Sequence, residues 1–187
     1  MATATVGSAG APLRGLAESS LEASQVLAGW HPLLMDEIDI VERRVPLPLR
    51  NGRLVFTVVG PEPRWLYPAL HSLQRVMHLP EGWDSYGGKI IDDDVVARAA
   101  EVLVTLPLPA EAPAPSVVPG SAGSLQLEWH EAGVDVEIHI SAIGQVSVFL
   151  SESESGPEFE FETLDSDARV RLGEVLVGLH GGVGVSH

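Results

Sequence analysis

Three segments in the second half of the chain alternate between apolar and polar residues. They are SLQLEWH at 124–130, VDVEIHI at 134–140 and QVSVFLS at 145–151. Alternation of this kind is typical of strands that bury one face and expose the other. EFEFE at 158–162 continues the pattern, and its two phenylalanines are expected to face the core. The sequence therefore predicts a four-stranded antiparallel β-meander with one apolar face.

Matching the apolar faces of neighbouring strands also predicts their registers. Trp129 must lie opposite Val136, because a shift by one residue would turn one of them to the other face. Ile138 must lie opposite Val148, which leaves a three-residue loop whose last member, Gly144, supplies the left-handed conformation. In these registers the acids and histidines of the meander face water.

A separate hairpin is predicted in the first half of the chain. A two-residue turn at Asn51–Gly52 would put Pro46 and Pro48 at positions that must donate hydrogen bonds to the ladder, and proline has no N–H to donate. A four-residue loop that places Leu49 opposite Leu54 would turn both prolines outward. The strand that holds these prolines is therefore expected to be an edge strand.

Four helices are predicted from apolar residues at helical spacing. They cover residues 15–29, 67–79, 93–106 and 165–179. Asp92 and Asp165 are the expected N-caps of the last two. The stretch 107–123, rich in Pro, Ala and Gly, is expected to be a linker with a short extended piece at 116–118. The predicted fold class is α+β: a four-stranded antiparallel β-meander with amphipathic helices on one face, plus an N-terminal helix and β-hairpin.

Composition suggests the domain boundaries. Residues 1–13 are rich in Gly, Ala and Pro, and a disordered N-terminus is expected. Residues 14–182 are predicted to form a single α+β domain, because 187 residues suit one compact unit with some loose chain. Within it, residues 14–65 hold the first helix and the hairpin, and residues 66–182 hold a helix–loop–helix, the meander and the last helix. Residues 183–187 are a tail.

The chain is acidic and has no cysteine, with a formal net charge of −15. Acidity argues against nucleic-acid binding, which needs Lys and Arg to neutralise phosphates. Without cysteine, thiol catalysis, cysteine-type zinc sites and disulfides are excluded. The sequence shows no signal-peptide pattern and no apolar run long enough to span a membrane, so a cytoplasmic location and no membrane partner are expected.

The charge is unevenly distributed. Segment 151–167 holds seven acids and no base, whereas segment 43–78 holds six arginines against one glutamate. The two segments could neutralise each other within the fold, or the acidic segment could dock a basic partner. Glu158, Glu160 and Glu162 are therefore candidate partner-binding residues.

The sequence WDSYGG at 83–88 lies between two predicted helices. In the structural interpretation, which is favoured, Trp83 and Tyr86 anchor a turn and Asp84 accepts hydrogen bonds from nearby backbone amides. In the functional interpretation the aromatic rings and the carboxylate grip a peptide or a small ligand. Trp83, Asp84 and Tyr86 are accordingly candidate partner- or ligand-binding residues.

The segment LPEGWDSYG at 79–87, followed by a helix, a proline-rich stretch and the strand LQLEW at 125–129, resembles an uncharacterised group of bacterial proteins. Members of that group share an LPxxWDxYG-type segment followed by a strand that ends in Glu-Trp. The similarity covers about 79–150, less than half of the chain. The group has no assigned activity, so the resemblance implies no catalytic residue, although it favours a protein partner.

The polar face of the meander is the candidate location for chemistry. The predicted registers put Glu128 opposite Glu137, with His130 and His139 on the same face. These four residues could bind a divalent metal, and paired carboxylates could act as acid and base. Against this, exposed strand faces commonly carry such residues, and no spaced ligand motif such as HExxH is present.

The leading hypothesis from the sequence is a non-enzymatic protein-binding module of a bacterial cytoplasmic system, as the neutralising or accessory component of a two-gene pair. Its partner is another protein, basic in character, and a homo-oligomer is left open. No catalytic residue and no cofactor are predicted. One alternative is a metal-dependent hydrolase that uses the Glu/His cluster of the meander. Another is a phage structural protein or a nucleic-acid mimic.

Overall fold

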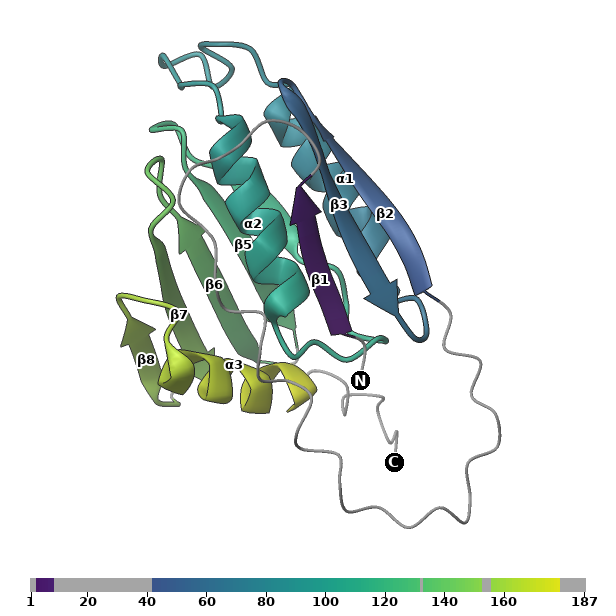
Figure 1. Ribbon diagram of the computed structural model, residues 1–187. Helices are drawn as coiled ribbons and strands as arrows, with labels where there is room; N and C mark the ends of the chain where they lie inside the picture. Colours follow the sequence, from purple (N-terminus) through teal and green to yellow (C-terminus); the bar gives the residue numbers. More distant parts are fainter. Residues whose placement is uncertain (1–2, 9–41, 132, 153–155, 179–187) are drawn as a thin grey trace, which may run out of the picture.

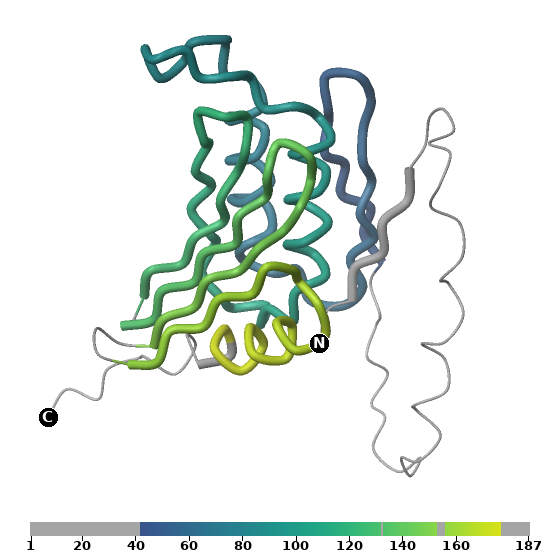
Figure 2. The backbone as a smooth tube through the Cα atoms, turned by 90° about the vertical axis from the view of Figure 1, so that its left-hand side faces the viewer, coloured from purple at the N-terminus to yellow at the C-terminus, as the bar shows by residue number. Residues whose placement is uncertain are grey.

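The computed structural model describes residues 3–8, 42–131, 133–152 and 156–178; of 3–8, 177 and 178 it describes the backbone only. These residues form an α+β fold with antiparallel sheets and three helices (Figure 1). Two of the helices, α1 and α2, lie between the two sheets, as Figure 2 shows from the side. No helix among the described residues is long and apolar enough to cross a membrane.

The larger sheet contains five strands in the order β4-β5-β6-β7-β8. Their bounds are β4 Ser116–Pro119, β5 Leu125–Glu131, β6 Val134–Ile140, β7 Val146–Glu152 and β8 Glu158–Phe161. The prediction of a four-stranded meander was therefore one strand short. The missing strand is β4, which lies in the proline-rich stretch expected to be a linker, where the sequence indicated only a short extended piece. Proline is tolerated there because β4 is an edge strand.

The registers predicted for the meander are confirmed. Trp129 lies opposite Val136, and Ile138 lies opposite Val148. Gly144 has a φ of 78°, which the three-residue loop between β6 and β7 requires. Phe159 lies opposite Leu150 and, partly buried, packs against the core.

The smaller sheet has the order β1-β3-β2, with β1 Thr3–Ser8, β2 Glu42–Leu49 and β3 Gly52–Val59. The position of β2 at an edge is as predicted. The expectation that residues 1–13 are disordered is wrong for the stretch 3–8, which pairs with β3. Antiparallel pairing uses backbone groups that every residue other than proline carries, so a stretch without an apolar pattern can add to an open edge.

The predicted register of the hairpin β2–β3 is wrong by two residues. Leu49 lies opposite Gly52, not Leu54, and a two-residue loop joins the strands. In such a hairpin the residues that flank the loop form a hydrogen-bonded pair, and the pairs alternate from there. Pro46 and Pro48 then fall at positions that do not bond to β3. This shorter loop satisfies the prolines as well as the four-residue loop would, and it adds two residues to the pairing.

The helices are α1 Leu66–Met77, α2 Asp93–Thr105 and α3 Ser166–Gly178, close to three of the predicted ranges. The helix predicted at 15–29 and the tail at 183–187 lie outside the described residues. Asp165 caps α3 as expected, with its Oδ1 accepting from the amides of Asp167 and Ala168 at 3.0 Å. Asp92 occupies the N-cap position of α2 but makes no side-chain cap hydrogen bond.

The hairpin loop is joined to the start of α2 by polar contacts. The amide of Asn51 donates to Oδ2 of Asp93 at 2.8 Å, and the guanidinium of Arg50 donates to the carbonyl of Ile91 at 2.7 Å. The carboxylate of Asp93 therefore anchors the smaller sheet to the middle layer.

One core runs through the two sheets and the helices between them. Its members in α2 lie on both sides of that helix and include Val95, Val96, Ala100, Val102 and Leu103. A helix that is apolar nearly all round is buried on two sides, and α2 contacts strands of both sheets. Because the helices occupy only the inner face of the five-stranded sheet, no element among the described residues covers its outer face (Figures 1 and 2).

Candidate functional site on the outer face of the five-stranded sheet

The outer face of the five-stranded sheet gathers most of the candidate residues. Strand parity places there the even-numbered residues of β5 and β8 and the odd-numbered residues of β6 and β7, since their neighbours are the buried ones. The members with polar or aromatic side chains are Gln126, Glu128, His130, Asp135, Glu137, His139, Ser147, Phe149, Ser151, Glu158 and Glu160. Together they form what we call the acidic face.

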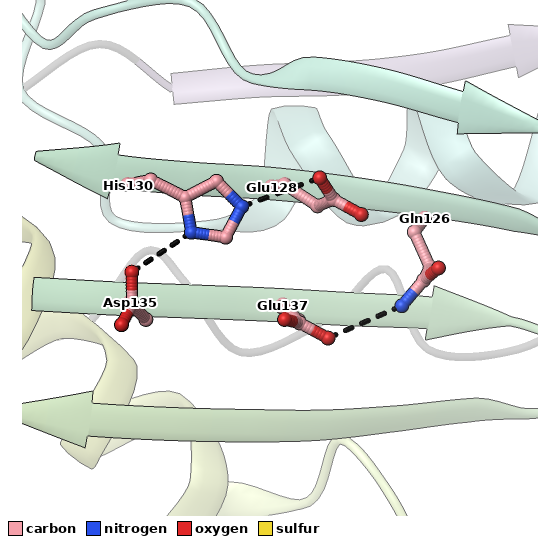
Figure 3. Close-up of polar contacts among 5 residues, drawn as sticks. All are labelled: Gln126, Glu128, His130, Asp135 and Glu137. Carbon is pink, nitrogen blue, oxygen red and sulfur yellow. Dashed lines mark hydrogen bonds and ion pairs between the residues drawn. The ribbon is translucent and has the colours of Figure 1, made fainter.

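His130 lies between two carboxylates of the acidic face (Figure 3). Its Nδ1 lies 2.8 Å from Oδ1 of Asp135 on β6, and its Nε2 lies 3.3 Å from Oε2 of Glu128 on its own strand. Hydrogen bonding to Asp135, and then to Glu128, raises the pKa of His130 above its ordinary value. Both ring nitrogens are therefore engaged by protein carboxylates.

The four candidate metal ligands are not brought together into one site. Glu137 instead accepts a hydrogen bond from Nε2 of Gln126 at 3.2 Å. His139 lies opposite Gln126 and Ser147, two residues further along β6 than Glu137. Among the described residues, no group of three or more His, Asp and Glu side chains is arranged to hold a metal ion. The proposed set of Glu128, His130, Glu137 and His139 thus shares a face but not a coordination centre.

Phe149 is an apolar side chain on the acidic face. It lies directly opposite Glu137 of β6 and Glu160 of β8, and it is only partly buried. A phenyl ring flanked by carboxylates offers contact area at the centre of a charged surface, which is the composition of many binding sites. Phe149 is not among the candidate residues that the sequence pattern indicates, although the parity of QVSVFLS places it on the polar side.

The strand β8 carries two of the three candidate acids of the C-terminal segment. Glu158 and Glu160 are exposed on the acidic face, and Glu162 follows the end of the strand. Glu162 lines a shallow hollow together with Arg98 of α2 and Asp165. Only Glu158 and Glu160 therefore belong to the acidic face.

The inner side of β8 is held against α3. The guanidinium of Arg171 lies 4.6 Å from the centre of the Phe159 ring, a cation–π contact. Arg171 also pairs with Glu152 at the end of β7, and with Glu174 at 2.9 Å. These contacts hold β8 in place without using the acids of its outer side.

The loop that contains Trp83 and Asp84 is closed by its own hydrogen bonds. Oδ1 of Asp84 accepts from the amides of Tyr86 and Gly88 at 2.8 and 2.7 Å, and its Oδ2 accepts from the hydroxyl of Ser121 at 2.6 Å. The hydroxyl of Ser121, then the two amides, lower the pKa of Asp84 below its ordinary value. Trp83 donates through Nε1 to the carbonyl of Lys89 at 3.2 Å.

These contacts favour the structural interpretation for Trp83 and Asp84, whose polar atoms are already used within the fold. Tyr86 differs, because its side chain is 94% exposed at the tip of the loop. Ser121 completes the loop although it lies 37 residues further along the chain, and nothing in the sequence signals this contact. The loop and the acidic face are thus two separate groups of candidates, and the acidic face carries the larger number of carboxylates.

We expect His130 to titrate above the ordinary histidine value near 6.5. The protonated ring is held by two carboxylates, so its contribution to folding stability is present below about pH 6.5 and is lost as the pH rises through the folded pKa. An NMR pH titration of the ring signals measures this midpoint. In the variant D135N the Asp135 carboxylate, which makes the largest contribution to the raised pKa of His130, is removed, and the midpoint should fall. A wild-type midpoint no higher than that of D135N would contradict the contact.

The chain was also compared with protein-family models, with curated proteins and with solved structures, and no match was found in any of the three comparisons.

Proposed function

We propose that this protein is a non-enzymatic binding protein of the bacterial cytoplasm, and that its acidic face docks a basic segment of a partner protein. The observation that carries the proposal is the row formed by Glu137, Phe149 and Glu160, which runs across three neighbouring strands on a sheet face that no described element covers. The role as the neutralising or accessory component of a two-gene pair is part of the proposal.

Electrostatics supports a basic partner. The chain has a formal net charge of −15, and Glu128, Asp135, Glu158 and Glu160 add their charges to the same face as Glu137. Clustered charges of one sign raise the association rate of an oppositely charged partner and disfavour acidic competitors. Partly exposed Phe149 supplies the apolar contact that a purely charged surface lacks. A protein that normally binds nucleic acid is one kind of basic partner that such a face would fit.

Co-expression with the product of the neighbouring gene tests the proposal, because that product is the expected partner. We expect a complex whose dissociation constant rises with salt concentration, as screening weakens exposed ion pairs. Replacing Glu160 by lysine should weaken the complex about fivefold to tenfold, which corresponds to about 1–1.4 kcal/mol. Isothermal titration calorimetry of the purified proteins gives the constants.

Glu111→Lys is the matched control, since it makes the same change in net charge. Glu111 is exposed, pairs with Arg64, and lies outside the five-stranded sheet. This variant should bind within about twofold of the wild type, because Glu111 lies outside the acidic face. Loss of its surface ion pair with Arg64 should cost little folding stability. Equal weakening by both variants would show that only the net charge matters, and absence of a complex would refute the proposal.

A further inference from the structure

We propose that β8 is a docking edge, to which an extended partner segment adds as a sixth strand of the larger sheet. The segment would alternate between basic and apolar residues. This inference rests on the proposed function and names the partner's chemistry and its mode of binding. Strand addition to an open edge is a recurrent way for proteins to bind peptides, with main-chain hydrogen bonds supplying affinity and alternate side chains supplying specificity.

The residues of β8 alternate between those that bond to β7 and those whose backbone groups point away from it, and the two glutamates are of the second kind. The amide of Glu152 donates to the carbonyl of Pro157 at 3.4 Å, which makes these two residues a hydrogen-bonded pair. Because such pairs alternate in an antiparallel ladder, Phe159 and Phe161 bond to β7, whereas the backbone groups of Glu158 and Glu160 point away from it.

The hydrogen bonds of the loop between β6 and β7 lead independently to the same assignment of outward-facing residues in β8. The amide of Ser141 donates to the carbonyl of Gln145 at 2.8 Å. Counting alternate pairs from there, Val148 and Leu150 do not bond to β6, so their backbone groups face β8. Their partners on β8 are Phe161 and Phe159, which again leaves Glu158 and Glu160 with outward N–H and C=O groups.

Proline interrupts the other two edges whose side chains are described. In β2, Pro46 and Pro48 occupy two of the outward positions that do not bond to β3, so the outward N–H is missing at both. In β4, the amide of Gly120 donates to the carbonyl of Ser124 at 2.9 Å, which places Pro119 at an outward position. By contrast, β8 contains no proline and keeps its outward donors.

The two sides of β8 determine which side chains the added strand should carry. Glu158 and Glu160 project to the acidic face, so the residues next to them would be Lys or Arg. Phe159 and Phe161 project to the inner side and are partly buried, so the residues next to them would be apolar. A segment with basic and apolar residues in alternation satisfies both sides.

A second copy of this chain is a poorer occupant of the same edge. Antiparallel pairing of two β8 strands would place the glutamates of one copy beside those of the other, and like charges on neighbouring strands are destabilising. Charged side chains on edge strands commonly prevent such self-association. The same charges attract a basic segment, so the edge is selective for a partner of opposite charge.

The test uses the full chain and a synthetic peptide of alternating lysine and valine, with fluorescence anisotropy at low salt as the measurement. A peptide of the same composition, with all the lysines in one block, is the control for electrostatic attraction alone. We expect the alternating peptide to bind about tenfold more tightly than the block peptide. This difference corresponds to the net contribution of about two main-chain hydrogen bonds to the binding free energy.

Two variants at Glu160 distinguish the contribution of its backbone N–H to binding from that of its carboxylate. Glu160→Pro removes both the carboxylate and the outward N–H, whereas Glu160→Gln removes the carboxylate and keeps the N–H. Since the N–H of Glu160 is not used in pairing with β7, the proline variant should fold, and circular dichroism checks this. We expect E160P to lose about tenfold or more in affinity and E160Q no more than about threefold.

The peptide itself provides a measurement that does not depend on any variant folding. N-methylation of alternate peptide amides should abolish binding when the methyl groups face β8 and should leave it unchanged when they face solvent. If both methylated peptides, or both glutamate variants, bind alike, strand addition is overturned while electrostatic docking stands. If neither the alternating nor the block peptide binds the wild type at low salt, the proposed function falls as well. Concentration-dependent dimerisation through β8 would also overturn the inference.

Discussion

Replacing Ile138 by alanine should lower the free energy of unfolding by about 2–5 kcal/mol, the largest effect that we expect from a single substitution. Ile138 is fully buried in the central strand β6 and lies opposite Leu127 on one side and Val148 on the other. Removal of its side chain leaves a cavity that neighbouring strands cannot close, because their positions are fixed by the hydrogen-bond ladder. Chemical denaturation followed by circular dichroism measures the change.

His139→Ala is the matched control, one residue away on the opposite face. His139 is partly exposed on the acidic face, and a substitution there should change the free energy of unfolding by no more than about 0.5 kcal/mol. Similar losses for the two variants would mean that both faces of β6 are buried. That result would remove the exposed acidic face on which both proposals depend.

Gly88→Ala should give the second largest effect, a loss of about 1–3 kcal/mol. A Cβ at this position would lie 2.8 Å from Cγ of Asp84 and 2.8 Å from Nε1 of Trp83. The two groups cannot both move away, because the amide of Gly88 itself donates to Asp84 at 2.7 Å. Denaturation gives the loss in stability, and the indole N–H signal of Trp83 in NMR spectra reports the change in the loop.

Gly52→Ala provides the comparison for a glycine without such neighbours. A Cβ added at Gly52 would meet no atom within 4 Å, and its φ is not in the left-handed region. We expect its stability to stay within about 0.5 kcal/mol of the wild type. If G88A were as stable as G52A, the contacts of the Asp84 carboxylate would not be needed to hold the loop.

Along a strand, both the side chains and the backbone groups of successive residues point alternately in opposite directions. In the five-stranded sheet the inner side of the strands packs against the helices, and the outer side of β5, β6 and β8 carries carboxylates. In β8 the same alternation applies to the backbone, because every second residue turns its N–H and C=O groups to the open edge. The side chains and the backbone groups of Glu158 and Glu160 are thus both directed to places that a partner can reach.

Much of the fold follows from the sequence alone. The period-2 alternation placed Trp129 opposite Val136 and Ile138 opposite Val148, and the structure has these pairs. Patterns of this kind are reliable because a one-residue slip would expose the whole apolar set of a strand. For the same reason the sequence determined which acids and histidines lie on the outer face.

Tertiary structure decided what local patterns do not encode. The hairpin β2–β3 keeps the same apolar face in either of two registers that differ by two residues, so parity could not choose between them, and the structure has the shorter loop. The strands β1 and β4 pair through backbone groups, which leave little trace in a sequence. Ser121 reaches Asp84, 37 residues away along the chain, because folding brings distant segments together. The sequence fixes what each residue can bind, and only the folded chain decides which partner is within reach.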